Sequence, residues 1–278
     1  KVSIKTRCQT KTVQWDEQTQ HYLLETDLRE FTAQSVVMAT GGLSIPTLGA
    51  SGFGYDIARQ FDLKCYPTRA GLVPFTLAKK QLEIFKTLSG SSIDVEVRFD
   101  DVVFQEAMLF THRGLSGPAM LQISSYWRPG QAITINLVPG KNVIQWLKNR
   151  QQQRGNAELK SILSEFSSKN ISQVFSEYLL ANNGINNAAM KTFNEKQLQK
   201  IEQILTNWII VPAGTEGYRT AEVTLGGVDT DEVSSKTFEC KKQPGLFFIG
   251  EVLDVTGHLG GYNFQWAWSS GAAAGEYV

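Results

Sequence analysis

The chain contains 278 residues, a length that favours about two domains at roughly 150 residues each. It carries 27 Lys and Arg against 27 Asp and Glu, and this zero net charge argues against a nucleic-acid partner, which would need a basic face. Apolar residues make up 42% of the composition, but no apolar run approaches the ~20 residues that would cross a bilayer. We therefore expect a globular protein with no nucleic-acid partner and no membrane partner.

The first part of the chain predicts a small antiparallel sheet followed by one buried strand. Apolar and polar residues alternate, as in half-buried strands, over four runs: Val2–Thr6, Thr10–Trp15, Tyr22–Thr26 and Phe31–Ala33. The run Ser35–Thr40 instead has a continuous apolar centre and ends at Gly41, which is typical of a parallel strand buried on both faces. Ligands of open α/β sheets bind at such carboxyl ends. A glycine loop, Gly49–Gly54, then leads into a short helix over Tyr55–Phe61.

The middle of the chain predicts a β module and then a helical module. Polar turns separate three strand-like runs that indicate an antiparallel sheet or small barrel: Leu72–Leu77, Ile93–Phe99 and Ala132–Val138. Gly114–Pro118 interrupts these runs and starts a helix over Ala119–Ser125, with Pro118 in its first turn. Residues 142–210 have the pattern of helices, because apolar residues recur at helical spacing in two core stripes: Leu159, Ile162, Leu163 and Phe166, then Leu198, Ile201, Leu205 and Trp208.

The last part of the chain returns to α/β character. Val223–Leu225 predicts a strand, and Leu246–Ile249 is another continuously apolar run, followed by Gly250 and Glu251. A glycine-rich loop then leads to a final helix over Asn263–Tyr277. The sequence therefore predicts one nucleotide-binding α/β domain split by a long insertion. Its expected segments are the first part of the domain, a barrel-like module, a helical module, a return strand and the last part of the domain: 1–65, 66–140, 141–210, 211–225 and 226–278.

Several familiar catalytic patterns are absent from the sequence. It contains no P-loop, no G-x-S-x-G nucleophile elbow and no G-x-G-x-x-G fingerprint, since Gly49–Gly54 has its glycines in the reverse order. The acidic residues within 229–232 follow two glycines and are typical of a solvated turn, and the three histidines stand apart, so we expect no metal site. Three widely spaced cysteines predict reduced thiols of a cytoplasmic protein: Cys8, Cys65 and Cys240.

The strongest signal lies where the second buried run ends. This strand would deliver Glu251 to the carboxyl edge of the sheet, where its carboxylate can accept hydrogen bonds from ligand hydroxyls. Gly260 and Gly261 then let the backbone approach a ligand closely before the final helix begins. The N-terminus of that helix offers unpaired N–H groups and the positive end of its dipole. We favour a ligand site here over an ordinary glycine-rich corner.

At this point the sequence resembles a known family. Val36–Gly42 resembles the "ATG" segment of FAD enzymes with two dinucleotide-binding motifs, and Phe247–Glu251 resembles their second FAD motif, with Glu for the usual Asp. Three longer segments are similar to the BaiN/RdsA family of NAD(P)/FAD-dependent oxidoreductases, the YhiN-like bacterial flavoproteins: Phe110–Ala119, Ala221–Val228 and Gly250–Ala267. The resemblance implies a Rossmann-like FAD-binding domain, split by an inserted β-barrel and helical bundle.

Carried onto matching positions, the resemblance implies a set of cofactor-binding residues. They are Thr10 beside adenine, Thr40 and Gly41 beside the nucleotide, Gly250 and Glu251 at the ribityl chain, and Gly260, Gly261, Tyr262 and Asn263 towards the pyrimidine edge of the flavin. Catalytic residues stay unassigned. His112 and Arg113 are candidates for binding an anionic substrate group, and His258 for approaching the flavin, while a surface Arg and an ordinary hydrogen-bonded His remain the alternative.

The resemblance also implies a missing segment. The family's amino-terminal βαβ unit, with its G-x-G-x-x-G, should precede Lys1, so roughly 100 residues are expected to be absent. We therefore expect FAD to bind the intact protein but not to be retained by this chain, which we expect to be inactive.

The function expected from these observations is that of an FAD-dependent oxidoreductase. It would transfer hydride between NADH or NADPH and an unidentified small organic substrate, since the cofactor performs the redox chemistry. Two alternatives stay open. One is a non-catalytic scaffold with a vestigial nucleotide pocket, and the other is an FAD-dependent RNA-modifying enzyme, which the neutral charge disfavours.

Overall fold

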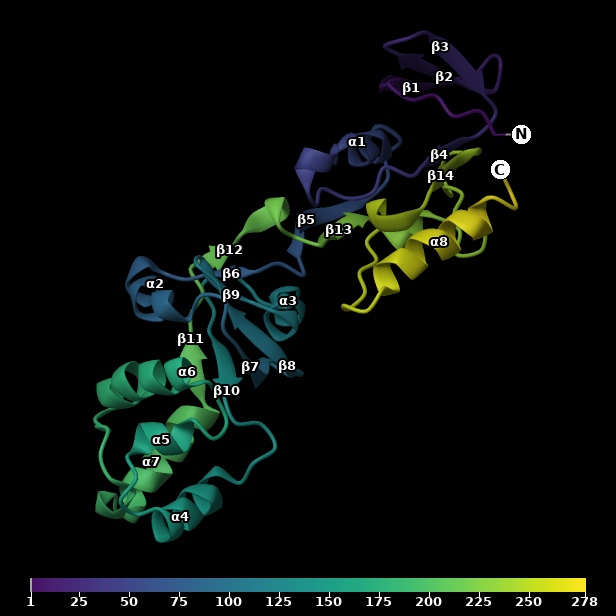
Figure 1. The fold of residues 1–278 in the computed structure, drawn as a ribbon. Coiled ribbons are helices and arrows are strands. Elements are labelled where there is room, and N and C mark those ends of the chain that lie inside the picture. The colour runs from purple at the N-terminus through teal and green to yellow at the C-terminus, as the bar shows by residue number, and fades with distance from the viewer. Residues whose placement is uncertain (1) are drawn as a thin grey trace. The chain divides into compact units, whose positions relative to one another are not determined.

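The computed structural model describes residues 2–278, apart from the side chain of Leu179, so Lys1 lies outside the described residues. The chain divides into two compact units, each with its own apolar core (Figure 1). The split unit contains Lys1–Ala70 and Glu222–Val278, and the middle unit contains Gly71–Ala221.

The split unit begins with an antiparallel meander, as predicted. Its strands pair in sequence order: β1 Thr10–Asp16, β2 His21–Thr26 and β3 Glu30–Ala33. The predicted strand Val2–Thr6 is wrong, because no described strand pairs with it and its apolar side chains are exposed, Val2 by 92% and Ile4 by 82%. Alternation alone does not make a strand when no neighbour takes up its backbone hydrogen bonds.

The two continuously apolar runs form a parallel pair of strands. β4 Val36–Met38 lies beside β14 Leu246–Phe248, in a register that pairs Val36 with Leu246 and Met38 with Phe248 (Figure 1). The other side of β14 hydrogen-bonds to the segment 238–240. Parallel strands point the same way, so both carboxyl ends lie at one edge. This adjacency of segments about 200 residues apart confirms the prediction on which the expected site depends.

Two helices and a second strand pair complete the split unit. α1 Phe53–Gln60 and α8 Tyr262–Ala274 are the predicted helices, each beginning one or two residues earlier than expected. β5 Cys65–Gly71 pairs with β13 Val223–Val228. Tyr55, Ile57 and Ala58 of α1 join the apolar core that includes β4 and β14.

The middle unit contains a seven-stranded sheet whose established pairings are antiparallel. Its strands, in spatial order, are β11 Trp208–Ile210, β10 Ile133–Asn136, β7 Ser92–Phe99, β8 Val102–Phe110, β9 Gly114–Ser116, β6 Phe75–Thr76 and β12 Gly214–Thr215. β8 was not predicted from the sequence. Residues 208–210 were predicted as part of the helical stretch, but they form β11, in which Trp208 pairs with Ile135. The antiparallel sheet is confirmed, whereas its closure into a barrel stays a prediction.

Helices complete the middle unit. They are α2 Lys79–Phe85, α3 Pro118–Ser124, α4 Val143–Gln153, α5 Leu159–Leu163, α6 Lys169–Val174 and α7 Glu195–Thr206. Asn194 begins α7 with a capping box to Gln197, and Asn142 caps α4. The stripes predicted over 159–166 and 198–208 pack in the core, as expected, but Phe166 lies beyond the end of α5 and is only partly buried, and Trp208 belongs to β11.

Short helical turns connect these elements. A π-helical turn covers Phe175–Leu180, and 3-10 turns cover Pro46–Leu48, Lys86–Leu88, Ala181–Asn183, Met190–Thr192, Gly217–Arg219, Thr230–Glu232 and Gly250–Val252. Across residues 2–278, we find no helix with the length and apolar character needed to traverse a bilayer.

Candidate functional site

The carboxyl ends of β4 and β14 bring together predicted residues from distant parts of the chain. Thr40 and Gly41 follow β4, whereas Gly250 and Glu251 follow β14. The N–H of Ile249 donates to the carbonyl oxygen of Met38 at 3.1 Å, which joins the two strands at this end. The strand ends therefore form one edge at which a ligand could meet both segments.

The Glu251 carboxylate accepts hydrogen bonds from the backbone of two other segments. The Thr224 N–H donates to Glu251 Oε1 at 2.7 Å, and the Gly42 N–H also hydrogen-bonds to this carboxylate. Burial raises the pKa of Glu251, and the two backbone donors oppose that rise. A Cβ on Gly42 would come within 2.5 Å of Thr224 Oγ1, so only glycine fits between these groups.

Thr224 and Asp254 tie β13 to this edge, and the sequence analysis assigned neither a role. The Leu43 N–H donates to Thr224 Oγ1 at 2.7 Å. The Gly226 N–H donates to Asp254 Oδ1 at 3.1 Å, and the Asp254 N–H donates to the Val228 carbonyl oxygen at 2.8 Å. The similarity of Ala221–Val228 to the family marked this segment as important, but only the fold shows what it contacts.

The final helix fixes the peptide groups on either side of Gly250. The Gly250 N–H donates to Ser270 Oγ at 3.0 Å, and Trp266 Nε1 donates to the Gly250 carbonyl oxygen at 3.0 Å. Trp266 and Ser270 are one helical turn apart on α8, so both face the exit of β14. The i, i+4 spacing predicts that Trp266 and Ser270 share one face of the helix, but it does not predict that this face meets Gly250.

The start of α8 has the open geometry that the sequence predicts. Gly261 precedes the helix with a φ of 90°, Gly260 has a φ of 116°, and no side chain caps the first turn. Asn263 instead holds the preceding loop, since its Oδ1 accepts from the Gly257 N–H and its Nδ2 donates to the Gly257 carbonyl oxygen. The helix can therefore direct backbone N–H groups and its positive dipole end towards an anion.

Thr10 and Thr40 line one cavity of about 540 Å³ in the split unit. The other lining residues are mainly apolar: Gln9, Val13, Leu24, Val36, Val37, Met38, Gly49, Ser51 and Phe53. Thr40 Oγ1 is buried without a hydrogen-bond partner, and a Cβ on Gly54 would collide with it. An unsatisfied buried hydroxyl at a strand end suits a ligand that supplies the missing hydrogen bond. Gly260, Gly261 and Tyr262 lie at the start of α8, outside this lining.

The weaker candidates occupy two units. His258 is an exposed residue of the loop before α8 in the split unit. His112 and Arg113 belong to the middle unit, between β8 and β9, where Arg113 Nη1 lies 3.7 Å from Glu216 Oε2. Arg113 therefore has an ion-pair partner within its own unit.

The acidic residues within 229–232 differ from the expected solvated turn. Asp229 is only 7% exposed, and its Oδ2 accepts from Lys64 Nζ at 2.8 Å. That interaction lowers the pKa of Asp229 to about 2. The expectation of a solvated turn is wrong for Asp229, because Lys64, the residue before β5, compensates for its burial.

Comparison with known proteins places these features in a family. The HI0933-like protein Rossmann domain matches residues 1–277. The chain is 52% identical over 244 residues to the ribosomal RNA dihydrouridine synthase of Escherichia coli (strain K12), covering 87% of this chain and 60% of that protein. It is 42% identical over 266 residues to the ribosomal RNA dihydrouridine synthase of Haemophilus influenzae, and the match covers 95% of this chain and 65% of that protein.

A third relative, with lower sequence identity, is named as a reductase of a bile acid. The chain is 27% identical over 267 residues to the 3-dehydro-bile acid delta(4,6)-reductase of Clostridium scindens, covering 92% of this chain and 64% of that protein. The chain thus spans less than two thirds of the length of each of these relatives.

These relatives overturn one expectation and establish the family. The prediction of a small-molecule substrate and no nucleic-acid partner is contradicted by two relatives named for ribosomal RNA. The zero net charge misled because it averages over the chain, whereas residues 141–210 contain nine Lys and Arg against five Asp and Glu. The match over residues 1–277 and the identity to these relatives show that the chain belongs to the HI0933-like Rossmann domain family.

Proposed function

We propose that the protein containing this chain is a flavin-dependent reductase that converts a uridine of ribosomal RNA into dihydrouridine. The observation that carries this proposal is the 52% identity, over 87% of the chain, to a relative of that name. The edge formed by β4 and β14 supports it, because Thr40 and Glu251 follow these paired strands, and the same unit contains the uncapped start of α8. Relatives named as a synthase and as a reductase favour this function over the scaffold alternative.

The names of the relatives share one type of chemistry. Reduction of uridine to dihydrouridine and reduction of a 3-oxo steroid at its Δ4 and Δ6 positions both saturate a carbon–carbon double bond conjugated with a carbonyl. Such a reduction adds a hydride at the far carbon and a proton at the carbon next to the carbonyl. In uridine these positions are C6 and C5. We infer that the family retains this chemistry while the substrate differs between members.

The residues of the split unit fit FAD, which would supply the hydride when bound, with NADH or NADPH as the electron source. Thr40 Oγ1 offers an unsatisfied buried hydroxyl, and the Glu251 carboxylate has lone pairs beyond those that meet Thr224 and Gly42. The first turn of α8, from Tyr262, would direct N–H groups at the pyrimidine edge of the ring and stabilise negative charge there. The other residues proposed to contact the cofactor are Thr10, Gly41, Gly250, Gly260, Gly261 and Asn263.

The remaining assignments are also proposals. We propose a flavin domain over 1–65 and 226–278, a barrel-like module over 66–140, a helical module over 141–210 and a return strand over 211–225. The compact split unit differs from these bounds, because it also includes 66–70 and 222–225, where β5 pairs with β13. His258 is the proposed proton donor of the split unit, because it lies in the loop between the anchored Gly257 and the glycines before α8. His112 and Arg113 stay proposed contacts of an anionic group, now the RNA backbone.

The experiment that tests this function measures dihydrouridine in ribosomal RNA from cells with and without the gene. Nuclease digestion and mass spectrometry detect dihydrouridine as a uridine that has gained two hydrogens. We expect one such residue to disappear on deletion and to return with the full-length parent gene. An unchanged dihydrouridine content after deletion would exclude the function.

A further inference from the structure

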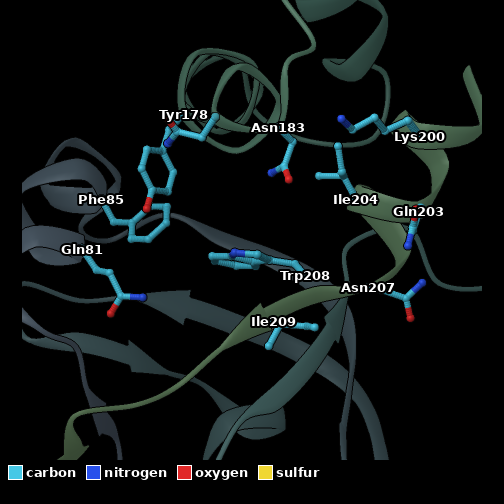
Figure 2. A pocket seen from close by; sticks show the side chains of 11 residues that line it. Gln81, Phe85, Tyr178, Asn183, Lys200, Gln203, Ile204, Asn207, Trp208 and Ile209 are labelled. Carbon is cyan, nitrogen blue, oxygen red and sulfur yellow. The ribbon is translucent and has the colours of Figure 1, made fainter. Parts of the chain in front are cut away.

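Phe85 and Trp208 border a cavity of about 410 Å³ in the middle unit (Figure 2). The two side chains are only 4% and 5% exposed, and their rings pack edge to face with centroids 5.5 Å apart. This aromatic pair therefore belongs to the core of the middle unit. The side chains that extend the proposed cofactor site lie instead in the split unit, on α8.

The exit of β14 is a tight turn that carries Glu251. Gly250 opens this 3-10 turn with a φ of 71°, a left-handed conformation that favours glycine. Its carbonyl oxygen accepts from the Leu253 N–H at 3.3 Å, which closes the turn, and from Trp266 Nε1 at 3.0 Å. Glu251 is the next residue, so a rotation of the Gly250 peptide groups would move its carboxylate.

Ser270 holds the other peptide group of Gly250 from a fixed position. Its side chain is fully buried, and its hydroxyl donates back into α8, to the carbonyl oxygen of Trp266 at 2.8 Å or of Ala267 at 3.1 Å. This bond orients the hydroxyl and leaves its oxygen to accept from the Gly250 N–H at 3.0 Å. Without the hydroxyl, the buried Gly250 N–H loses this acceptor.

A second ring fixes the indole of Trp266. Phe238 packs edge to face with it, with centroids 5.6 Å apart and planes at 71°. Phe238 is itself joined to β14, because its carbonyl oxygen accepts from the Phe248 N–H at 3.1 Å. The indole is thus held by the segment beside β14, while its N–H reaches the exit of the same strand.

One helix therefore connects two proposed contacts of the flavin. Its first turn begins at Tyr262 and is proposed to direct N–H groups at the pyrimidine edge of the ring. Trp266 and Ser270 lie about 6 and 12 Å further along the axis, at 1.5 Å per residue, and hold the residue before Glu251. The helix therefore sets the spacing between the ring contact and the carboxylate proposed to meet the ribityl hydroxyls.

We propose that Trp266 and Ser270 are positioning residues for the flavin, which act through the peptide groups of Gly250 to hold the Glu251 carboxylate where the ribityl hydroxyls bind. The choice of FAD rests on the proposed function, whereas the link from α8 to Glu251 rests on hydrogen bonds of this chain. A carboxylate held in place before the ligand arrives binds it at a smaller entropic cost. Neither side chain needs to touch the cofactor.

The first test compares two adjacent serines of α8. Ser270→Ala removes the buried hydroxyl, and Ser269→Ala removes an exposed one. Quenching of flavin fluorescence measures the affinity of the flavin-free, full-length parent protein and its variants for FAD. We expect Ser270→Ala to raise the dissociation constant about tenfold, and Ser269→Ala to leave it unchanged.

A second pair of variants tests the indole N–H with little change in packing. Trp266→Phe keeps an aromatic ring beside Phe238 but removes the donor to Gly250. Trp268→Phe makes the same exchange at a side chain that is 70% exposed. We expect the dissociation constant of FAD to rise about tenfold for Trp266→Phe and to stay unchanged for Trp268→Phe.

A double-mutant cycle separates positioning from a general loosening of the fold. Ser270→Ala and Trp266→Phe are each combined with Glu251→Ala, and the affinity for FAD is measured again. We expect the tenfold losses to disappear in this background, because the carboxylate that the helix positions has been removed. A general loosening of the site would produce the same loss in both backgrounds.

The outcomes separate this inference from the proposed function. Equal affinities within either matched pair, or losses that persist in the Glu251→Ala background, would overturn the positioning role. A parent protein that does not bind FAD would overturn both this role and the flavin-dependent reductase. The dihydrouridine content of ribosomal RNA judges the function on its own. Its loss on deletion alongside a failed cycle leaves the reductase and removes the positioning role, and an unchanged content alongside a coupled cycle does the reverse.

Discussion

The Glu251 carboxylate accepts hydrogen bonds from the backbone N–H groups of Thr224 and Gly42, so it organises the site even without a ligand. Removing it leaves both donors unpaired in a partly buried place. We predict that Glu251→Ala lowers the free energy of unfolding of the flavin-free chain by about 1–3 kcal/mol, measured by urea denaturation. The exposed Glu276→Ala serves as control and should change little. An unchanged midpoint of urea denaturation for Glu251→Ala would mean that these two hydrogen bonds do not stabilise the fold.

Gly261 and Gly52 form a matched pair, because each immediately precedes a helix and each has open space where a Cβ would stand. They differ in backbone conformation, with a φ of 90° at Gly261 and −78° at Gly52. We predict that Gly261→Ala destabilises the chain by about 1–2 kcal/mol, since an L side chain is strained at positive φ. Gly52→Ala should be neutral or stabilising. Equal unfolding free energies for the two variants would contradict this explanation.

At the scale of elements, an ion pair joins the residue before β5 to the residue after β13. Lys64 Nζ donates to Asp229 Oδ2, which lowers the pKa of Asp229 from 3.8 to about 2. A lowered pKa means that the pair stabilises the fold above pH 3.8 and that this stabilisation is lost as the pH falls towards 2. We predict that Asp229→Asn reduces the decline in unfolding free energy between these pH values.

Denaturant unfolding at several pH values measures this decline. Glu276→Gln provides an exposed carboxylate as the control, and it should keep the parent's pH dependence. A decline for Asp229→Asn as steep as that of the parent would show that other carboxyl groups determine acid stability.

The elements that sequence predicted best are those with one unambiguous pattern. The continuous apolar centres of β4 and β14 identified buried parallel strands, and the helical stripes of α5 and α7 identified core faces. β8 was not predicted because Gln105 and Glu106 interrupt its apolar pattern, although both residues pair with β7 in the hairpin. Val2–Thr6 had the pattern of a strand but has no described strand to pair with.

The candidate site was predictable where local chemistry determines it. Gly260 and Gly261 were recognisable as glycines at a helix start, and Glu251 as the acid after a buried strand. Thr224 and Ser270 were not recognisable, because their roles depend on segments about 20 to 30 residues away that only tertiary packing brings near. The sequence therefore predicted the residues at the edge, but not the hydrogen bonds that hold them.

At the scale of the whole molecule, a balanced total charge concealed an uneven distribution. The basic excess of residues 141–210 lies in the middle unit, whereas the edge formed by β4 and β14 lies in the split unit. Binding of a polyanion depends on local charge, so the sum over the chain was a poor guide.

We propose that a reduced flavin held at the β4–β14 edge transfers its hydride to a uridine of ribosomal RNA. The decisive experiment uses the full-length protein loaded with FAD, reduced by one equivalent of NADPH without oxygen and then mixed with ribosomal RNA that lacks dihydrouridine. We expect the absorbance of oxidised flavin to return while dihydrouridine forms in equal amount. A flavin that stays reduced in the presence of this RNA, and is reoxidised only when oxygen is admitted, would contradict it.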